Sequence, residues 1–449
     1  MSGTPPAAGY ARRLGLFDAT MLVIGGIVGA GIFLNPAVVA QRVPTPGLAL
    51  GVWVLGGIVA LAGALCFAEL GARKPFAGGG YVYLRDAFGP LPAFLYGWTQ
   101  LLVINSGGIA AVAVTFARYV TALGGWPTAS STPIAVGAIV FLSGVNYFGI
   151  RPGAIVQNVF TVLKMLALAG LIVAGFVLAA PAVTVAAPPA ELGPAGVVRA
   201  IGVALIPVLF AYGGWQSTNF VAEELRHPTR DLPRALVLGV IGVVVTYVLA
   251  NAVYLRVLGL DGLAASSAPA FDVMERLAGR TGSTAITVGI IISTFGFLNL
   301  AVLASPRVYQ AMAADGAFVR AAARLHPRHH VPSTALVIQA AWAILLLSTK
   351  TYEQLLDYVV FADWIFFGLV GATVVYLRIR EGDADLAFRT PGYPWVPVFF
   401  VATAGFTVVS TVVSNVGDAA LGALLMAAGI PAFLIWRARE RRRSQEHGS

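Results

Sequence analysis

The chain has 449 residues, of which 58% are hydrophobic and 11% are charged, and its mean hydropathy is +0.82. Because soluble domains carry about a quarter of their residues as Asp, Glu, Lys or Arg, this composition excludes a soluble protein and predicts an all-α membrane protein. The formal net charge of +9 does not indicate a nucleic-acid partner, since most of the basic residues fall in loops on one side of the predicted spans.

Apolar stretches of about twenty residues, the length that crosses the hydrocarbon layer, recur along the chain. They predict twelve transmembrane helices, centred near residues 27, 60, 103, 141, 166, 210, 246, 297, 341, 366, 403 and 427. The connections between them are short, so we expect residues 1–449 to form a single polytopic domain. We expect no cleavable signal peptide, because no small-residue cleavage site precedes the second span.

The Lys and Arg residues are divided unequally between the two sides of these spans. With both termini cytoplasmic, 21 of them lie in the inside loops and tails, including the basic tail at 437–443. The other side holds Arg42, Arg118, Arg199, Arg256, Arg276, Arg280 and Lys350. The positive-inside rule therefore predicts a multi-pass protein of the plasma (inner) membrane with both termini cytoplasmic.

Glycine-rich sequences interrupt the first and the sixth predicted helix. They are Gly-Gly-Ile-Val-Gly-Ala-Gly-Ile-Phe at 25–33 and Phe-Ala-Tyr-Gly-Gly-Trp at 210–215. Each glycine weakens a helix by roughly 1 kcal/mol relative to alanine, and broken backbone at membrane depth is tolerated only where it is buried in protein or lines a cavity. One broken helix in each half of the chain predicts a transporter whose substrate binds at the breaks.

The two breaks are five spans apart, which predicts an internal repeat. Residues 14–180 and 195–380 would form two halves of five spans each, and residues 392–437 would add two further helices. Because an odd number of spans reverses the direction of the chain, the second half would be inverted relative to the first.

The predicted breaks expose backbone groups of opposite polarity. Free N–H groups, which suit a carboxylate, are expected on Ala30, Gly31 and Ile32. Free carbonyl groups, which suit an ammonium, are expected on Ile27, Phe210, Ala211 and Gly213. An α-amino acid fits both sets, and each charge-assisted hydrogen bond would contribute roughly 1.5–3 kcal/mol.

Two aromatic residues, Phe210 and Trp215, flank the second break. Aromatic residues within spans commonly pack between helices or anchor the membrane interface. Beside an unwound segment they are also candidates to cap a bound substrate, and we predict Phe210 as a lid.

Lys164 and Asp363 are ionisable residues deep within predicted spans. An ammonium at the centre of a span costs about 2.5–3.5 kcal/mol on insertion scales. Lys164 either hydrogen-bonds to the broken first helix to hold it, or acts as a fixed or titrating cation in place of a coupling ion. For Asp363 three roles stay open, namely pairing for stability, lining the side-chain pocket and carrying a proton.

The cytoplasmic connections mix charge with glycine and aromatic residues. Residues 73–89 predict a short interfacial helix, and residues 223–236 alternate acid and base after span six. They are either ordinary solvated loops or a gate of ion pairs that breaks when the site opens inward. In the second interpretation Glu69 and Glu223 join Phe210 as gate residues.

We predict no metal and no cofactor. His326, His329 and His330 fall in a loop, where solvation explains them better than metal ligation. Cys66 is the single cysteine, so no intramolecular disulfide is expected. No nucleophile–base pair falls within the spans, so we do not expect an enzyme.

Several of these motifs together resemble the amino acid–polyamine–organocation superfamily, and within it the L-type amino acid transporter-like permeases. The matching segments lie at 29–33, 68–71, 164, 210–215, 223–235 and 323–327, so they cover nearly the whole chain. The resemblance implies a LeuT-type 5+5 inverted repeat with discontinuous helices 1 and 6, and amino acid transport without sodium.

The resemblance also assigns roles to individual residues. It carries the substrate-binding backbone positions onto Ile27, Ala30, Gly31, Phe210 and Gly213. It carries the lysine that stands in place of a sodium ion onto Lys164, with the hydroxyls of Ser293 and Thr294 nearby. The chain departs from the family's pattern where Ala30 replaces a serine, Gly80 a glutamate and Asp363 an asparagine of several relatives.

The sequence therefore predicts a permease that moves amino acids, for which we expect neutral substrates, by exchange or with protons. The alternative within transport is a carrier of cationic amino acids or polyamines with Asp363 as counter-charge, and the alternative outside it is a non-transporting amino acid sensor. The expected partners are the substrate and the lipid bilayer. Animal relatives link a glycoprotein through an extracellular cysteine that this chain lacks, so no disulfide-linked heavy chain is expected.

Overall fold

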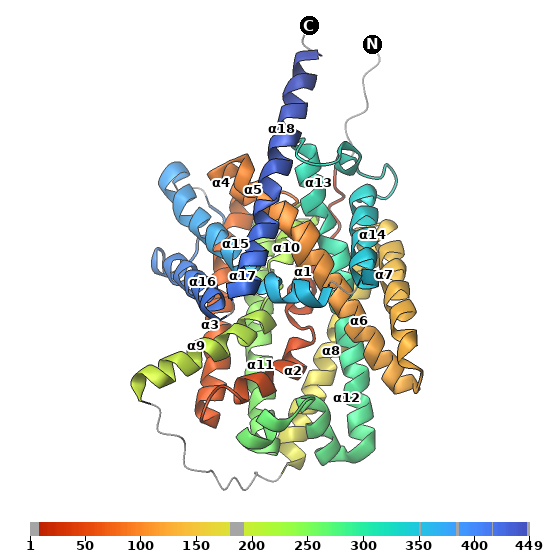
Figure 1. Cartoon of the computed structure of the whole chain (residues 1–449), viewed down its shortest axis with the longest axis vertical. Coiled ribbons are helices and arrows are strands. Elements are labelled where there is room, and N and C mark those ends of the chain that lie inside the picture. Colours follow the sequence, from red (N-terminus) through yellow and green to blue (C-terminus); the bar gives the residue numbers. More distant parts are fainter. Residues whose placement is uncertain (1–8, 180–192, 350–351, 383–385, 415, 447–449) are drawn as a thin grey trace.

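The structure, a computed structural model, describes residues 9–179, 193–349, 352–382, 386–414 and 416–446. Within these ranges the chain folds into helices, with one isolated β-bridge between Leu14 and Leu225. Both ends of the chain lie at the same end of the helix bundle, together with α4, α13 and the tip of α18 (Figure 1). We call this end the terminal face, and the end that carries α2 the opposite face.

The helices follow the order of the predicted spans, with extra short elements between them. In chain order they are α1 (Leu16–Ile27), α2 (Gly31–Ala40), α3 (Pro46–Arg73), α4 (Gly80–Phe88), α5 (Pro90–Thr99), the π-helical η1 (Gln100–Ile104), α6 (Asn105–Gly124), α7 (Ser131–Tyr147), α8 (Ile150–Leu178), α9 (Pro194–Ala211), α10 (Ser217–Phe220), η3 (Ala222–Glu224), α11 (Pro228–Ala265), α12 (Pro269–Ala304), α13 (Pro306–Ala314), α14 (Ser333–Thr349), α15 (Tyr352–Glu381), α16 (Trp395–Ser414), α17 (Val416–Ala427) and α18 (Gly429–Glu446).

Apolar helices long enough to cross a bilayer dominate the part of the chain that the structure describes. Nine helical segments pass this test alone, and the bent pair α1–α2 makes a tenth. The shorter apolar helices Ala195–Ala211 and Ser333–Thr349 lie at two more of the predicted positions. The expected multi-pass membrane protein is therefore confirmed, while the full count of twelve spans stays a prediction. Lys350, one of the charges counted on the opposite side, lies outside the described residues.

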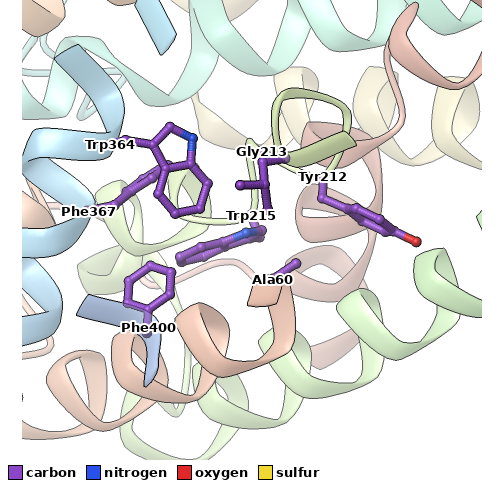
Figure 2. A pocket seen from close by; sticks show the side chains of 8 residues that line it. Ala60, Tyr212, Gly213, Trp215, Trp364, Phe367 and Phe400 are labelled. Carbon is purple, nitrogen blue, oxygen red and sulfur yellow. The ribbon is translucent and has the colours of Figure 1, made fainter. Parts of the chain in front are cut away.

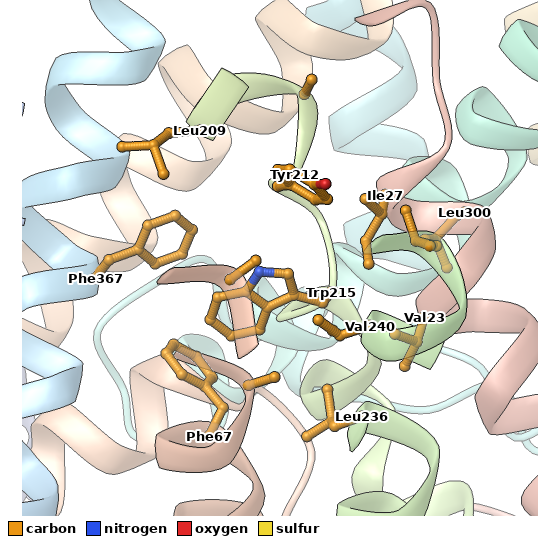
Figure 3. Packing of buried hydrophobic residues seen from close by; sticks show 14 of the residues in the cluster. Val23, Ile27, Phe67, Leu209, Tyr212, Trp215, Leu236, Val240, Leu300 and Phe367 are labelled. Carbon is orange, nitrogen blue, oxygen red and sulfur yellow. The ribbon is translucent and has the colours of Figure 1, made fainter. Parts of the chain in front are cut away.

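The broken helices occupy the middle of the bundle. α1 packs against α8, α11 and α12, while α2 packs against α9 and α11. Buried apolar side chains of these helices and of α3 and α15 meet around the second break, as Figure 3 shows for Val23, Trp215 and Phe367. The short helix expected within residues 73–89 is confirmed as α4, at the terminal face (Figure 1).

A proline inside α9 shows how side chains complete the backbone hydrogen bonding. Pro207 has no N–H, so the carbonyl of Val203 loses its partner within the helix. Arg42 Nη1 donates to that carbonyl at 2.7 Å, and Asn35 Nδ2 donates to the carbonyl of Pro207 itself at 2.8 Å. These contacts tie the half-helix before the second break to the segment that follows the first.

Candidate functional site

The two glycine-rich segments are breaks in the helices, and they touch each other. α1 ends at Ile27 and α2 begins at Gly31, with a bend of 40° between them. Gly214 has φ +112°, and a Cβ placed on it would lie 2.0 Å from the carbonyl oxygen of Gly26. Only glycine allows this contact between the two backbones. Both predicted breaks are therefore confirmed, and they form one site.

Lys164 holds the first break from α8. Its side chain is fully buried, and its Nζ donates to the carbonyl of Gly25 at 3.1 Å and to that of Val28 at 2.7 Å. A longer contact of 3.4 Å reaches the carbonyl of Ser293 on α12. The ammonium thus satisfies carbonyl groups that lose their helical partners where α1 ends.

Ser293 supports the same segment, whereas Thr294 does not. The Ser293 hydroxyl lies 3.1 Å from the carbonyl oxygen of Gly29 and 3.3 Å from that of Val28. The Thr294 hydroxyl donates to the carbonyls of its own helix, at Ile290 and Ile291. Of the two hydroxyls expected near Lys164, only the first contacts the broken backbone.

Tyr247 connects the two breaks, and sequence reasoning missed it. Its buried hydroxyl lies 3.1 Å from the carbonyl oxygen of Ile27 and 3.3 Å from that of Ala211. A hydroxyl carries one hydrogen, so it can donate fully to only one carbonyl at a time. No signal in the sequence distinguishes this residue from the other tyrosines, of which the chain has 14 in all.

The N–H groups at the start of α2 keep the arrangement expected from the sequence. Ala30 is the N-cap residue and provides no side-chain hydrogen bond. Within the described residues, no hydrogen bond takes the N–H of Ala30, Gly31 or Ile32. Ala30 and Gly31 are half-buried. The positive end of a ten-residue helix therefore points its free donors into the site.

The carbonyl groups at the breaks are less free than expected. The carbonyl of Phe210 accepts the N–H of Gly213 at 3.2 Å, and that of Ile27 accepts the N–H of Gly29 at 3.0 Å. The carbonyls of Ile27 and Ala211 also face the Tyr247 hydroxyl. The expectation that these carbonyls lack partners was therefore wrong for Phe210 and Ile27, whereas no donor to the Gly213 carbonyl is found among the described residues. The Phe210 carbonyl retains a second lone pair, but that of Ile27 faces two donors, Gly29 and Tyr247.

The two aromatic residues at the second break lie in different surroundings. Phe210 is 47% exposed, whereas Trp215 is 2% exposed. Trp215 stacks on Phe367 with ring centroids 5.6 Å apart and meets Phe67 edge-on at 4.8 Å. Beside Trp215 lies a small pocket, lined by residues of α3, α9, the second break, α15 and α16 (Figure 2). Its volume of about 10 Å³ is roughly that needed for one water molecule.

Asp363 does not line this pocket, although its neighbour Trp364 does. Asp363 Oδ1 is buried and has no hydrogen-bond partner among the described residues. The sequence placed Asp363 with the substrate-binding residues, and its role stays a prediction.

Of the predicted gate residues, Phe210 lies at the second break, whereas Glu69 and Glu223 lie at the terminal face, where ion pairs join several helices. Glu69 on α3 binds Arg378 on α15 through two contacts of 2.6 and 2.8 Å. Glu223 accepts the N–H of Ala77 and joins no ion pair of the described residues. Its neighbour Glu224 makes the buried ion pair instead, with Arg307 at 2.8 Å. The structure therefore assigns the paired carboxylate after the second break to Glu224 rather than to Glu223.

The N-terminal segment covers this ion pair. The N–H groups of Arg13 and Leu14 both donate to the carbonyl of Glu224, at 2.9 and 3.0 Å, and the N–H of Arg226 donates to the carbonyl of Leu14 at 2.9 Å. At the terminal face, buried ion pairs and backbone pairing thus join the N-terminal segment, α3, α13, α15 and the chain around Glu224.

The histidine cluster contacts itself and distant segments, since Tyr147 lies edge-on to His326 and His330 Nδ1 lies 3.0 Å from the carbonyl oxygen of Gly9. The His326 ring stacks on that of His329 with centroids 4.6 Å apart. His326 Nδ1 also accepts the backbone N–H groups of Arg328 and His329. In the part of the chain that the structure describes, no group of three or more His, Cys, Asp or Glu side chains is arranged to hold a metal ion.

Comparisons with known proteins agree with one another. The family model described as amino acid permease matches residues 14–436. The b(0,+)-type amino acid transporter 1 of Mus musculus is 32% identical over 90% of this chain and 83% of its own length. The serine/threonine exchanger SteT of Bacillus subtilis is 31% identical over 95% of this chain and 97% of its own length. The human cystine/glutamate transporter is 30% identical over 95% and 86%, respectively.

Proposed function

Since this chain belongs to the amino acid permease family and is a membrane transporter rather than an enzyme, we propose that it moves neutral L-amino acids by alternating access without sodium. Its relatives include transporters and exchangers of amino acids. The proposed cycle is exchange or proton-coupled uptake across the plasma (inner) membrane.

The observation that carries the proposal is the position of Lys164. Its ammonium binds the carbonyls of Gly25 and Val28 at the first break, and it approaches that of Ser293. Backbone carbonyls of an unwound helix are the ligands that transporters of this type offer to sodium. A protein-bound ammonium at such carbonyls makes a sodium ion unnecessary there, which supports transport independent of sodium.

The backbone at the two breaks supports a zwitterionic substrate. The free N–H groups of Ala30 and Gly31 suit a carboxylate, and the carbonyls of Ile27 and Ala211 suit an ammonium. Because the Ile27 carbonyl already faces the Gly29 N–H and the Tyr247 hydroxyl, an ammonium that binds it must displace that hydroxyl. We propose that α11 responds to substrate binding because its Tyr247 hydroxyl loses these carbonyls to the substrate ammonium. We also propose that the exposed Phe210 closes over the substrate as its lid.

The fold that we propose is the LeuT-type 5+5 inverted repeat, with repeats over 14–180 and 195–380. Its support is the direct contact between the breaks of α1–α2 and α9–α10, which are five predicted spans apart. We further propose that the terminal face is cytoplasmic, because the loops and tails of that side are the richer in Lys and Arg. The conformation described here would then be closed toward the cytoplasm.

Transport by the purified protein in proteoliposomes tests the proposal. Labelled alanine should enter vesicles preloaded with unlabelled alanine at the same rate in sodium and in choline buffers. Strict dependence on sodium would overturn the assignment of Lys164. Binding of alanine without any transport would favour an amino acid sensor.

Competition identifies the substrate class. Each of the twenty amino acids and putrescine is added in excess over labelled alanine, and neutral amino acids should compete most strongly. Stronger competition by arginine or putrescine would favour the alternative carrier of cationic substrates, with Asp363 as its counter-charge.

A further inference from the structure

Asp363 is a carboxyl group at membrane depth for which the site described above has no use. Its Oδ1 is buried and lacks a hydrogen-bond partner among the described residues. None of the ion pairs that those residues form includes it. The residue as a whole is half-buried. A carboxylate oxygen that is buried without a partner is nevertheless expensive at membrane depth, so such a group either takes up a proton or marks an ion pathway.

Tyr96 on α5 is the titratable side chain that neighbours Asp363, and Tyr83 on α4 and Tyr309 on α13 neighbour Tyr96 in turn. Tyr96 also packs edge-on against Phe366, one helical turn along α15, with centroids 5.2 Å apart. Neutral tyrosine hydroxyls can exchange hydrogen bonds with a carboxylic acid, but they cannot neutralise a carboxylate.

The charged residues of the other helices that pack against α15 are engaged elsewhere. On α3, Glu69 pairs with Arg378. On α4, Arg85 pairs with Asp315 at the terminal face, at 2.7 Å. Arg118 lies on α6, which also packs against α15, and it is not free either. No ion pair among the described residues therefore holds Asp363 in its ionised form.

An irregular and polar segment packs beside this part of α15, where Val103 and Ile104 cluster with Ala362. η1 is a π-helical turn packed against α15, and such turns occur frequently at functional sites. In this turn the backbone carbonyl of Gln100 accepts a hydrogen bond from the Tyr309 hydroxyl at 3.3 Å. The side-chain oxygen of Gln100, Oε1, accepts one from Asn105 Nδ2 at 2.6 Å. The hydroxyls of Ser106 on α6 and of Ser305, which directly precedes α13, are also buried and unpartnered. Polar groups of this kind can pass on a proton.

We propose that Asp363 binds the proton that couples this transporter to a pH gradient, a role that rests on the proposed amino acid transport. The carboxyl group is the neutral acid in the conformation closed at the terminal face. When that face opens, more water reaches the half-buried group, and the proton leaves for the water while the carboxylate becomes hydrated. Lys164 then keeps its charge throughout the cycle, and Asp363 is the group whose charge changes.

The test measures two activities of the same vesicles, with labelled alanine as the probe. The first is exchange against internal alanine without a pH gradient, and the second is accumulation in vesicles without internal alanine when the outside is made acidic. Asp363→Asn keeps the shape and the neutral state of the side chain. It should retain exchange within about threefold and lose the gradient-driven accumulation.

The matched control is Asp261→Asn, which removes an exposed carboxylate from α11 and should leave both activities unchanged. Asp363→Glu keeps an acid at the same position and serves if the asparagine variant does not reach the membrane. It should accumulate alanine with a shifted midpoint of the pH dependence.

Three results would overturn the proposal. The first is gradient-driven accumulation by Asp363→Asn equal to that of the wild type, and the second is a wild type that exchanges alanine but ignores the gradient. The third is the loss of both activities in a folded Asp363→Asn protein, which would assign Asp363 to substrate binding. The first two leave the proposed amino acid transport intact, whereas a wild type that moves no amino acid would defeat that proposal itself.

Discussion

The two breaks look alike in the sequence, yet the protein holds them in different ways. Side chains from neighbouring helices hold the first break, through the ammonium of Lys164 and the hydroxyl of Ser293. Apart from the Tyr247 hydroxyl, which contacts both breaks, the second break is held by its own turn, in which Gln216 Oε1 accepts the N–H of Gly214 at 2.9 Å, and by the contact of Gly214 with Gly26. The first break therefore depends on chemistry supplied from α8 and α12, and the second depends on close packing.

Because of this difference, we expect the first break to change its contacts easily and the second to stay rigid. Hydrogen bonds from long side chains can lengthen or change partners as helices shift, whereas two backbones in contact cannot slide past each other without separating. The first break is thus suited to respond to changes in charge, and the second to fix the geometry of the site.

The largest effect should follow from filling the contact between the breaks. In Gly214→Ala the new Cβ would lie 2.0 Å from the Gly26 carbonyl oxygen, at φ +112°. The positive φ alone costs about 1–3 kcal/mol for a residue other than glycine, and the backbone must also move apart. We expect exchange in proteoliposomes to be abolished and the unfolding temperature of the purified protein to fall.

The control for this prediction is Gly242→Ala on α11, where an added Cβ meets nothing within 4 Å. It should unfold at the temperature of the wild type or slightly above it. Normal exchange by Gly214→Ala would show that the two backbones are not held together during transport.

The next largest effect should follow from removing the cation at the first break. Lys164→Ala leaves the carbonyls of Gly25 and Val28 without this donor, and a buried unsatisfied group costs about 1–3 kcal/mol. For the two carbonyls together this cost is about 2–6 kcal/mol. Because 1.4 kcal/mol is a factor of ten, the transport rate should fall by roughly 30-fold or more. We expect the initial rate of exchange to fall accordingly, and wild-type kinetics would remove Lys164 from the mechanism.

A smaller effect should follow from removing one hydroxyl from the same break. In Ser293→Ala the carbonyl of Val28 keeps Lys164, but that of Gly29 loses its donor. The loss of one hydrogen bond is worth about 0.5–1.5 kcal/mol, so exchange should slow by roughly 2- to 10-fold. Thr294→Val should have less effect, because that hydroxyl binds only its own helix, and an equal loss in both variants would contradict this distinction.

An effect of similar size, but on the KM, concerns the hydroxyl that joins the two breaks. If the substrate ammonium must displace the Tyr247 hydroxyl, Tyr247→Phe should lower the KM for alanine by about 2- to 10-fold, the worth of one hydrogen bond. The kcat should change less than the KM. A raised KM would show instead that the hydroxyl orients the carbonyls for binding, and the comparison of initial rates over a range of alanine concentrations decides between them.

The sequence predicted those site residues whose type is unusual at their position in a membrane span. A lysine in the middle of an apolar span and paired glycines at equivalent positions of two spans are exceptional, so Lys164 and both breaks could be predicted. Tyr247 is an ordinary residue in an apolar helix, and its role arises only from the position of α11 beside both breaks.

Other features depend on geometry that a linear sequence does not contain. Glu223 and Glu224 are adjacent acids, and the turn of η3 decides that the second is buried against Arg307. The engagement of the Phe210 and Ile27 carbonyls likewise depends on local turns of two and three residues. The helical fold and its breaks followed from composition and glycine positions, whereas these pairings required coordinates.

The pairing of the N-terminal segment with the chain around Glu224 has a consequence for how the molecule moves. Leu14 lies two residues before α1, and Leu225 directly follows η3. At its C-terminal end, α1 contacts the second break, through Gly26 against Gly214. At its N-terminal end it pairs with the chain that follows that break, through Leu14 and Leu225. We therefore expect α1 and the segment from Gly214 to Leu225 to move together as one unit.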